Sequence, residues 1–250
     1  MKDNNRIEKL FAAAAAIGVW QIIAMLIDNS LLIATPLVVA SKLLHLGFSL
    51  EFWTVLSFSF FRIVMGFLIG LVIGILFAVI AGRFHFAEIM FYPYMVAVKS
   101  IPVASFIILC LIWLNSKSLS IFIAFLMVLP IIYTNVLQGI KNTDEKLLEM
   151  AYLFRMRWWR KVYYIYLPQL KPYLVSASSV AIGLSWKAGI AAEVIGIPAG
   201  SIGEKLYEAK VYFSSADLFA WTVAIVVVSI LFEKMFTHGI KLLFIGRVKI

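Results

Sequence analysis

Long apolar runs alternate with short polar segments along the chain. The runs cover about residues 10–27, 58–82, 91–114, 119–137, 173–195 and 218–236. Each is close to the roughly 20 residues that a helix needs to cross the hydrocarbon core of a bilayer. The pattern therefore predicts an all-α membrane protein with six transmembrane helices in a single domain over residues 1–250. The first run is longer than the apolar core of a signal peptide, so we expect an uncleaved span.

Small residues form a stripe along one face of the second run. They recur every four residues, at Gly66, Gly70, Gly74, Ala78 and Gly82. Such stripes let transmembrane backbones approach each other closely. Packing against another helix of the same chain is the favoured interpretation, and a seam between two copies is the alternative.

Prolines predict two irregular segments. Thr35 and Pro36 indicate the start of a short helix within residues 31–52, because threonine caps helices and proline suits their first position. We expect this helix to lie along the outer membrane surface. Pro93 and Pro102 predict that the third run is a broken or kinked helix.

Residues 141–172 form the only long polar segment, with seven basic and three acidic side chains. We predict two short helices joined by a bend. Asn142 or Thr143 is expected to cap the first helix, in which Leu147, Ala151 and Phe154 make one apolar face. Charges surround this face, which favours a protein partner. The second helix, with three tyrosines, is expected to stop at Pro168.

The basic balance of the chain reports orientation in the membrane. The sequence is 63% hydrophobic, which excludes an ordinary soluble domain, and its formal net charge is +9. If both termini and residues 141–172 are cytoplasmic, the inner segments hold 15 of the 22 Lys and Arg residues and the outer segments hold four. This distribution obeys the positive-inside rule and removes the argument for nucleic acid. The one cysteine, Cys110, excludes a disulfide framework.

Among the charged side chains within predicted spans, three are candidates for a functional site, because an ionisable group there usually faces a cavity or a partner. They are Lys99, Lys187 and Glu193. Trp186 shares a helix face with Glu193, whereas Lys187 points about a quarter turn away. We therefore take Lys99, Trp186, Lys187 and Glu193 as candidates for a substrate path. The alternatives are that Glu193 lies in water at the outer boundary, that Lys99 reaches the inner surface, and that Trp186 only packs.

The polar segment resembles the EAA loop of ABC importer permeases. The matching positions, at the spacing of that motif, are Glu149, Ala151, Arg155, Ile165, Leu167 and Pro168. Two letters depart from it, because Met150 replaces alanine and Arg155 stands where the family usually has glycine. The resemblance implies that residues 141–172 are a cytoplasmic coupling loop that docks on a separate ATPase. How arginine changes the bend is left open, and a loop resting on lipid headgroups is the alternative.

Three further segments narrow the resemblance to the nitrate, sulfonate and taurine branch of these permeases. They are SFSFFRIVMGF at residues 57–67, KSIPVASF at 99–106 and SWKAGIAAEVIG at 185–196. The branch implies the type I importer permease fold with six spans. It also implies uptake of a small solute from an external binding protein, with a nitrate-like or sulfonate-like anion favoured. Relatives in the branch that move thiamine precursors, flavins or other solutes keep the substrate open.

The same resemblance implies the partners. They are two copies of an ATPase subunit that binds ATP and Mg, a second permease and an extracytoplasmic binding protein. For the second permease, an identical chain that forms a homodimer is favoured. The chain itself contains no G-x-x-x-x-G-K-[ST] phosphate loop, which agrees with a separate ATPase. We expect no cofactor, metal site or catalytic residue in this chain.

Two other classes of protein fit the sequence less well. An intramembrane enzyme is disfavoured because His45, His85 and His238 lie outside the apolar runs or near the end of the chain, without a metalloprotease or serine hydrolase motif. A secondary transporter driven by an ion gradient also suits charges and prolines within spans. It has no use for a docking loop, so the ATP-driven importer is the preferred interpretation.

Overall fold

The computed structural model describes residues 4–27, 29 and 31–245, and every regular element in these ranges is a helix. The elements are α1 (Asn4–Ile27), α2 (Pro36–Gly47), α3 (Leu50–Arg83), α4 (His85–Ser100), α5 (Val103–Cys110), α6 (Ser116–Lys141), α7 (Glu145–Leu153), α8 (Trp158–Lys161), the π-helical η1 (Val162–Tyr166), α9 (Leu167–Gly196), α10 (Ile202–Val211) and α11 (Ser215–Ile245). The predicted all-α class is confirmed for the described residues.

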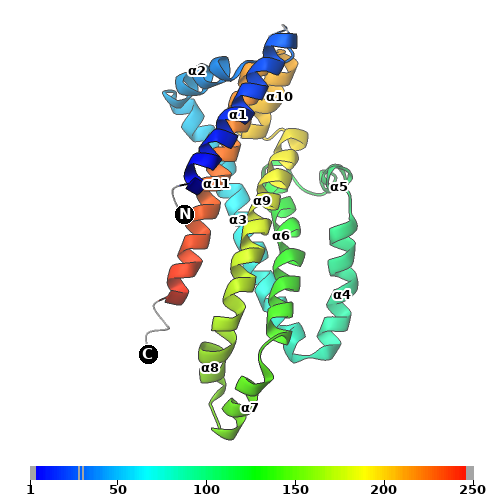
Figure 1. Ribbon diagram of the computed structural model, residues 1–250. Coiled ribbons are helices and arrows are strands. Elements are labelled where there is room, and N and C mark those ends of the chain that lie inside the picture. Colours follow the sequence, from blue (N-terminus) through cyan, green and yellow to red (C-terminus); the bar gives the residue numbers. More distant parts are fainter. Residues whose placement is uncertain (1–3, 28, 30, 246–250) are drawn as a thin grey trace.

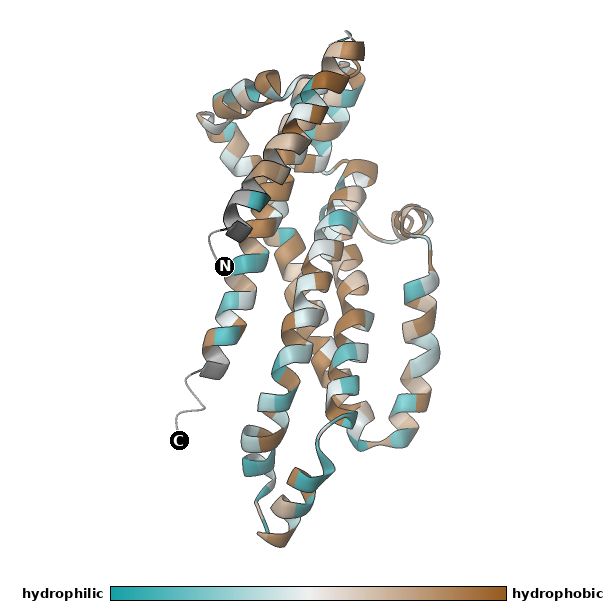
Figure 2. Cartoon of the chain, in the orientation of Figure 1, coloured by the Kyte–Doolittle hydropathy of each residue, from teal (hydrophilic) through white to brown (hydrophobic). Residues whose placement is uncertain are grey.

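The long helices α3, α6, α9 and α11 run lengthwise through the molecule (Figure 1). Helices α7 and α8 lie at one end, which we call the α7 end. Helices α2 and α10 lie at the other, which we call the α10 end. Apolar residues dominate the long helices, whereas hydrophilic residues gather on α7, on α8 and in the loops (Figure 2).

Four described helices are long and apolar enough to cross a membrane: Leu50–Arg83, Ser116–Lys141, Trp158–Gly196 and Ser215–Leu242. Helices α4 and α5 together pass the same test but are bent by 102° at their junction, as expected for a run that contains Pro93 and Pro102. These helices contain five of the six predicted spans. The predicted span at 10–27 falls on α1, whose apolar part, Ala14–Ile27, is shorter than a span.

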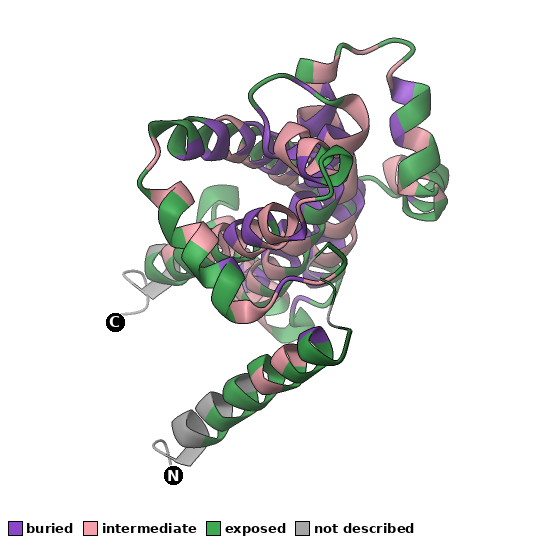
Figure 3. Cartoon of the chain, turned by 90° about the horizontal axis from the view of Figure 1, so that it is seen from above, coloured by how far each residue is buried: buried purple, intermediate pink, exposed green. Residues whose placement is uncertain are grey.

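Helix α1 projects from the bundle but is joined to it at Trp20, whose ring lies 5.3 Å from that of Phe219 of α11. Seen from above, it projects away from the other helices and is exposed along most of its described side chains (Figure 3). Helix α2 lies across the α10 end, and it starts as predicted, with Thr35 as N-cap and proline in its first turn.

The glycine stripe joins α3 to α6. A Cβ atom added at Gly66 would lie 2.3 Å from the carbonyl oxygen of Ile121, and one at Gly70 would lie 2.7 Å from Cβ of Val128. Gly74 and Gly82 meet α6 in the same way. The predicted packing within the chain is therefore confirmed, and close backbone contact makes α3 and α6 one rigid unit.

Substituting Gly66 by alanine should destabilise the protein, because the new methyl group meets backbone atoms that cannot rotate away. We expect a loss of about 1–3 kcal/mol, the range for overpacking. Gly183→Ala is the matched control, since nothing lies within 4 Å of the atom added there. Thermal unfolding of the purified variants in detergent is the measurement. Equal unfolding temperatures for Gly66→Ala and the wild type would contradict the close α3–α6 contact.

Candidate functional site

Helix α7 begins one residue later than the sequence suggested. Asp144 is the N-cap, and its carboxylate accepts a hydrogen bond of 2.9 Å from the backbone N–H of Lys146. The prediction that Asn142 or Thr143 caps α7 is wrong because the end of α6 uses both side chains. Asn142 donates to the hydroxyl of Tyr173 at 3.1 Å, and Thr143 donates to the carbonyl of Gly139 at 3.3 Å.

Helix α7 ends in a left-handed turn at Arg155, whose φ is 48°. The N–H of Met156 bonds to the carbonyl of Ala151 at 2.9 Å, and the N–H of Arg155 bonds to the carbonyl of Tyr152 at 3.0 Å. These two bonds define a Schellman motif, in which the left-handed residue is usually glycine. The turn that the glycine of the EAA pattern would allow is therefore present here with arginine in its place.

The surface of α7 differs from the predicted apolar face. Ala151 is buried within the chain, whereas Phe154 is 76% exposed, so the two do not form one open surface with Leu147. The apolar side chains open to a partner are instead Met150, Tyr152, Leu153 and Phe154. Leu148, Glu149, Tyr152 and Leu153 line an open depression of about 460 Å³. The run of apolar residues at 150 and 152–154, too dense for one buried face, was the signal in the sequence.

The predicted helix stop at Pro168 is also wrong. Residues Trp158–Gly196 form one helical path through α8, η1 and α9, and Pro168 lies in the first turn of α9. The N–H of Leu167 bonds to the carbonyl of Val162, five residues back, so the turn before the proline is wider than an α-turn. This widening accommodates a residue without an N–H. Ile165 is buried, and Pro168 is exposed.

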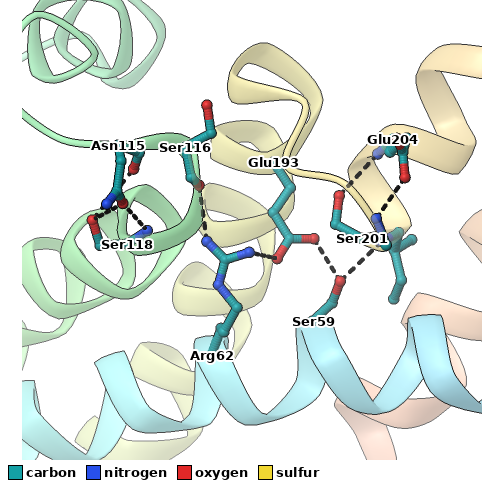
Figure 4. A network of polar contacts seen from close by, with 10 residues as sticks. Ser59, Arg62, Asn115, Ser116, Ser118, Glu193, Ser201 and Glu204 are labelled. Atoms are coloured by element: carbon teal, nitrogen blue, oxygen red, sulfur yellow. Dashed lines mark hydrogen bonds and ion pairs between the residues drawn. The ribbon is translucent and has the colours of Figure 1, made fainter.

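A buried polar network lies near the α10 end, where α3, α6, α9 and α10 meet (Figure 4). Glu193 of α9 is completely buried. Its Oε2 accepts a hydrogen bond of 2.6 Å from the hydroxyl of Ser59, and its Oε1 lies 3.7 Å from Nη1 of Arg62. Arg62 also donates from Nη2 to the carbonyl of Ser116 at 2.9 Å. The network thus pairs the charge of Glu193 inside the chain.

The same network positions the start of α10. The hydroxyl of Ser59 accepts a bond of 2.9 Å from the N–H of Ile202. A Cβ atom at Gly203 would lie 2.2 Å from the carbonyl carbon of Glu193, so only glycine lets α10 pack this closely on α9. Sequence reasoning identified Glu193 but missed Ser59 and Arg62. The signal was present, because Ser59 and Arg62 are three residues apart and therefore share a face of an apolar helix.

Ion pairs at the surface also fasten α10. Lys205 lies 2.8 Å from a carboxylate oxygen of Glu51 on α3 and 3.1 Å from one of Glu208. The hydrogen bond with Glu51 is the main reason that the pKa of Lys205 is raised above the ordinary value for lysine. The lysine therefore stays charged at neutral pH, and it ties α10 to the beginning of α3.

The structure separates the four candidates for a substrate path into two groups. Trp186 and Glu193 lie on one face of α9, as predicted, and both are buried, with Trp186 beside the ring of Phe60. Lys187 and Lys99 are exposed. Lys99 donates a long hydrogen bond of 3.4 Å to the hydroxyl of Thr134. The assignment of all four to a path stays a prediction.

Comparison with known proteins gives a consistent set of matches. Residues 70–238 match the model of the family described as binding-protein-dependent transport system inner membrane component. The chain is similar to the putative aliphatic sulfonates transport permease protein SsuC of Bacillus subtilis, with 25% identity over 222 residues, or 88% of this chain and 80% of that protein. The protein of the same name from Escherichia coli is 27% identical over 197 residues, or 78% and 75% of the two chains. The bicarbonate transport system permease protein CmpB of Synechococcus elongatus is 25% identical over 184 residues, or 73% and 66%.

Replacing Arg155 by glycine should stabilise the turn after α7. A residue with a side chain loses roughly 1–2 kcal/mol in the left-handed region, and glycine does not. We expect slower hydrogen exchange of the α7 amides in Arg155→Gly. Lys161→Gly is the control, because Lys161 has a helical φ of −60° and glycine should speed exchange there. Faster exchange in α7 of Arg155→Gly would contradict the assigned strain.

Removing one partner of the buried ion pair should destabilise the protein strongly. Arg62→Leu or Glu193→Leu leaves an uncompensated buried charge, which typically costs about 3–5 kcal/mol. The double variant Arg62→Leu/Glu193→Leu should unfold at a higher temperature than either single variant, because it leaves neither charge alone. Thermal unfolding in detergent measures this, with the exposed Lys187→Leu as control. Additive losses in the double variant would refute the pairing.

Proposed function

Because the chain belongs to the family of binding-protein-dependent transport system inner membrane components, we propose that it is the permease subunit of an ATP-driven importer. The observation that supports this most directly is the open apolar surface of α7. It lies at one end of the candidate spans and falls on the EAA-like spacing of residues 149–168. A separate ATPase subunit is the partner that fits it.

The α7 surface has the composition of a docking site. Tyr152 and Leu153 are each 78% exposed, and Phe154 and Met150 extend the same apolar surface. Large apolar and aromatic side chains of this kind form the centres of protein interfaces. Glu149 lies at the edge of the depression that Leu148, Tyr152 and Leu153 line, so it would set the charge that the ATPase groove must match.

Orientation and assembly follow from the same proposal. The α7 end would be cytoplasmic, with both termini on that side, α1 as the sixth span and residues 141–172 as the coupling loop. Two copies of the chain would form a homodimer on two ATPase subunits, since symmetric pairing is the commonest way to close an assembly. The binding protein would deliver its solute at the α10 end.

The mechanism we propose is alternating access. Closure of the ATPase subunits would move α7, and α7 is bound at its base to α9, because the N–H of Asp144 donates to Oε1 of Gln169 at 3.0 Å. Movement of α7 therefore reaches α6 and α9 together. The path would lie between two copies, with the exposed Lys187 and Lys99 favouring an anion, and with Trp186 and Glu193 supporting the wall. A small anion agrees with the sulfonate and bicarbonate permeases among the relatives.

Purification of the tagged protein from its native membranes in mild detergent tests the class. Mass spectrometry of the co-purifying chains should recover an ATPase with a phosphate loop, together with an extracytoplasmic binding protein. Recovery of the permease alone, under conditions that preserve a control ABC complex, would refute the proposal.

Glu149→Lys should uncouple transport while the protein remains inserted in the membrane. Reversing this charge at the docking surface should lower ATPase recovery at least about tenfold, which corresponds to about 1.4 kcal/mol of binding free energy. The measurement is the ratio of ATPase to permease in the purified complex, with Glu8→Lys on α1 as a control of equal charge change. Unchanged recovery would remove Glu149 from the docking surface.

A further inference from the structure

Helices α4 and α5 form an arm beside the bundle. Helix α4 stands off from α3, α6 and α9 in Figure 1, and α5 turns back toward the bundle after the 102° bend. Phe86, Tyr92 and Tyr94 of α4 are all at least 65% exposed. Few side chains of α4 therefore determine where that helix lies, whereas α5 is anchored by its buried Ile107 and Cys110.

The middle of the arm is held by apolar contacts. The ring of Phe91 stacks on Phe77 of α3 at 4.6 Å and meets the edge of Tyr133 of α6 at 6.2 Å. Met95 is buried beside them. These ring contacts hold the middle of α4 against α3 and α6.

The end of the arm nearest α7 is held by a charged contact. Nζ of Lys141 lies 2.6 Å from Oε1 of Glu88, and Nδ1 of His85 lies 3.7 Å from the other oxygen of that carboxylate. Lys141 is the last residue of α6 and stands three residues before Asp144, the N-cap of α7. The base of the coupling loop is therefore bound to the arm.

The same base is bound to α9 on its other side. Asn142 reaches Tyr173 at 3.1 Å, and the N–H of Asp144 reaches Gln169 at 3.0 Å. Four consecutive residues, 141–144, thus join α4, α6, α7 and α9. Residues 141–144 reach α4 through the Glu88–Lys141 pair. Further along the arm, Phe91 and Lys99 meet Tyr133 and Thr134 of α6.

We propose that the Glu88–Lys141 ion pair is a positioning element that transmits movement of the coupling loop to the α4–α5 arm. The inference rests on the proposed function. Lys141 is half-exposed, and ion pairs at such sites add little to stability. The Glu88–Lys141 contact nevertheless fixes the distance between the start of α4 and the end of α6. The arm that this contact holds includes Lys99, a candidate for the substrate path.

The experiment follows the arm directly and needs no identified solute. Tyr92→Cys on α4 is reacted with a maleimide in the full complex, in vesicles, without nucleotide and with a non-hydrolysable ATP analogue plus Mg²⁺. The buried Cys110 is replaced by serine in all variants. The measured quantity is the ratio of the two modification rates.

In the parent protein we expect the two modification rates to differ by at least about fivefold, the lower range of measured coupling between sites. In Glu88→Lys or Lys141→Glu the two rates should become nearly equal. The exchanged pair Glu88→Lys/Lys141→Glu should restore the difference, because the attraction returns with opposite sense. Arg83→Glu is the matched control for Lys141→Glu, since it makes the same charge change at the end of the neighbouring helix α3 without touching the pair. Permease recovery and unfolding temperature should stay at parental values in all variants. If the pair were merely structural, the variants that lose the response to nucleotide would also lose stability.

Single reversals that keep the parental ratio would overturn the inference, and so would an exchanged pair that fails to restore it. If the parent complex contains the ATPase but the modification rate of Tyr92→Cys does not change with nucleotide, the inference is overturned and the proposed function stands. A parent protein that recovers no ATPase would overturn both.

Discussion

The buried pair of Arg62 and Glu193 is the interaction on which the architecture of the α10 end depends. Removing two charges from water is expensive, and the attraction between them offsets this only when their remaining hydrogen-bonding groups are used. Ser59 and the carbonyl of Ser116 supply two such bonds, and Ser59 extends the network to the N–H of Ile202. The ion pair and these hydrogen bonds therefore link α3, the start of α6, α9 and α10.

The two ends of the molecule are built in contrasting ways. At the α10 end the polar groups point inward. Oε2 of Glu193 and Nη2 of Arg62 are hydrogen-bonded within the chain, whereas Oε1 of Glu193 and Nε and Nη1 of Arg62 are buried without a hydrogen-bond partner. At the α7 end the apolar groups of Tyr152, Leu153 and Phe154 point outward. Between the ends, α6 packs closely along the glycines of α3, so the two helices form one rigid unit. The rigid α3–α6 pair thus connects the exposed apolar surface at the α7 end with the buried polar network at the α10 end. This arrangement suits a protein in which movement at the α7 end changes access to a site elsewhere.

Local patterns in the sequence predicted most of the helices, and long-range contacts explain what they missed. Hydropathy predicts the long helices because lipid selects composition over some 20 residues. The glycine spacing predicted close packing because its cause is local geometry. By contrast, Asp144 is the N-cap of α7 because Asn142 is engaged by Tyr173, 31 residues away, and Thr143 bonds back to the carbonyl of Gly139 at the end of α6. The pairing of Arg62 with Glu193 joins residues 131 positions apart, and no local pattern reports it.

Arg155 shows how a backbone requirement persists when the preferred residue is absent. The left-handed turn after α7 is unfavourable for arginine by itself, yet two backbone hydrogen bonds close it, and Ala151 is buried just before it. A turn at this point directs the chain from α7 back toward α8, and α8 continues without a break into α9. Without the turn, α7 and α9 could not both sit on the base at residues 141–144. The strain at one residue is thus offset by contacts made throughout the loop, and the spacing of the motif is maintained by geometry rather than by glycine itself.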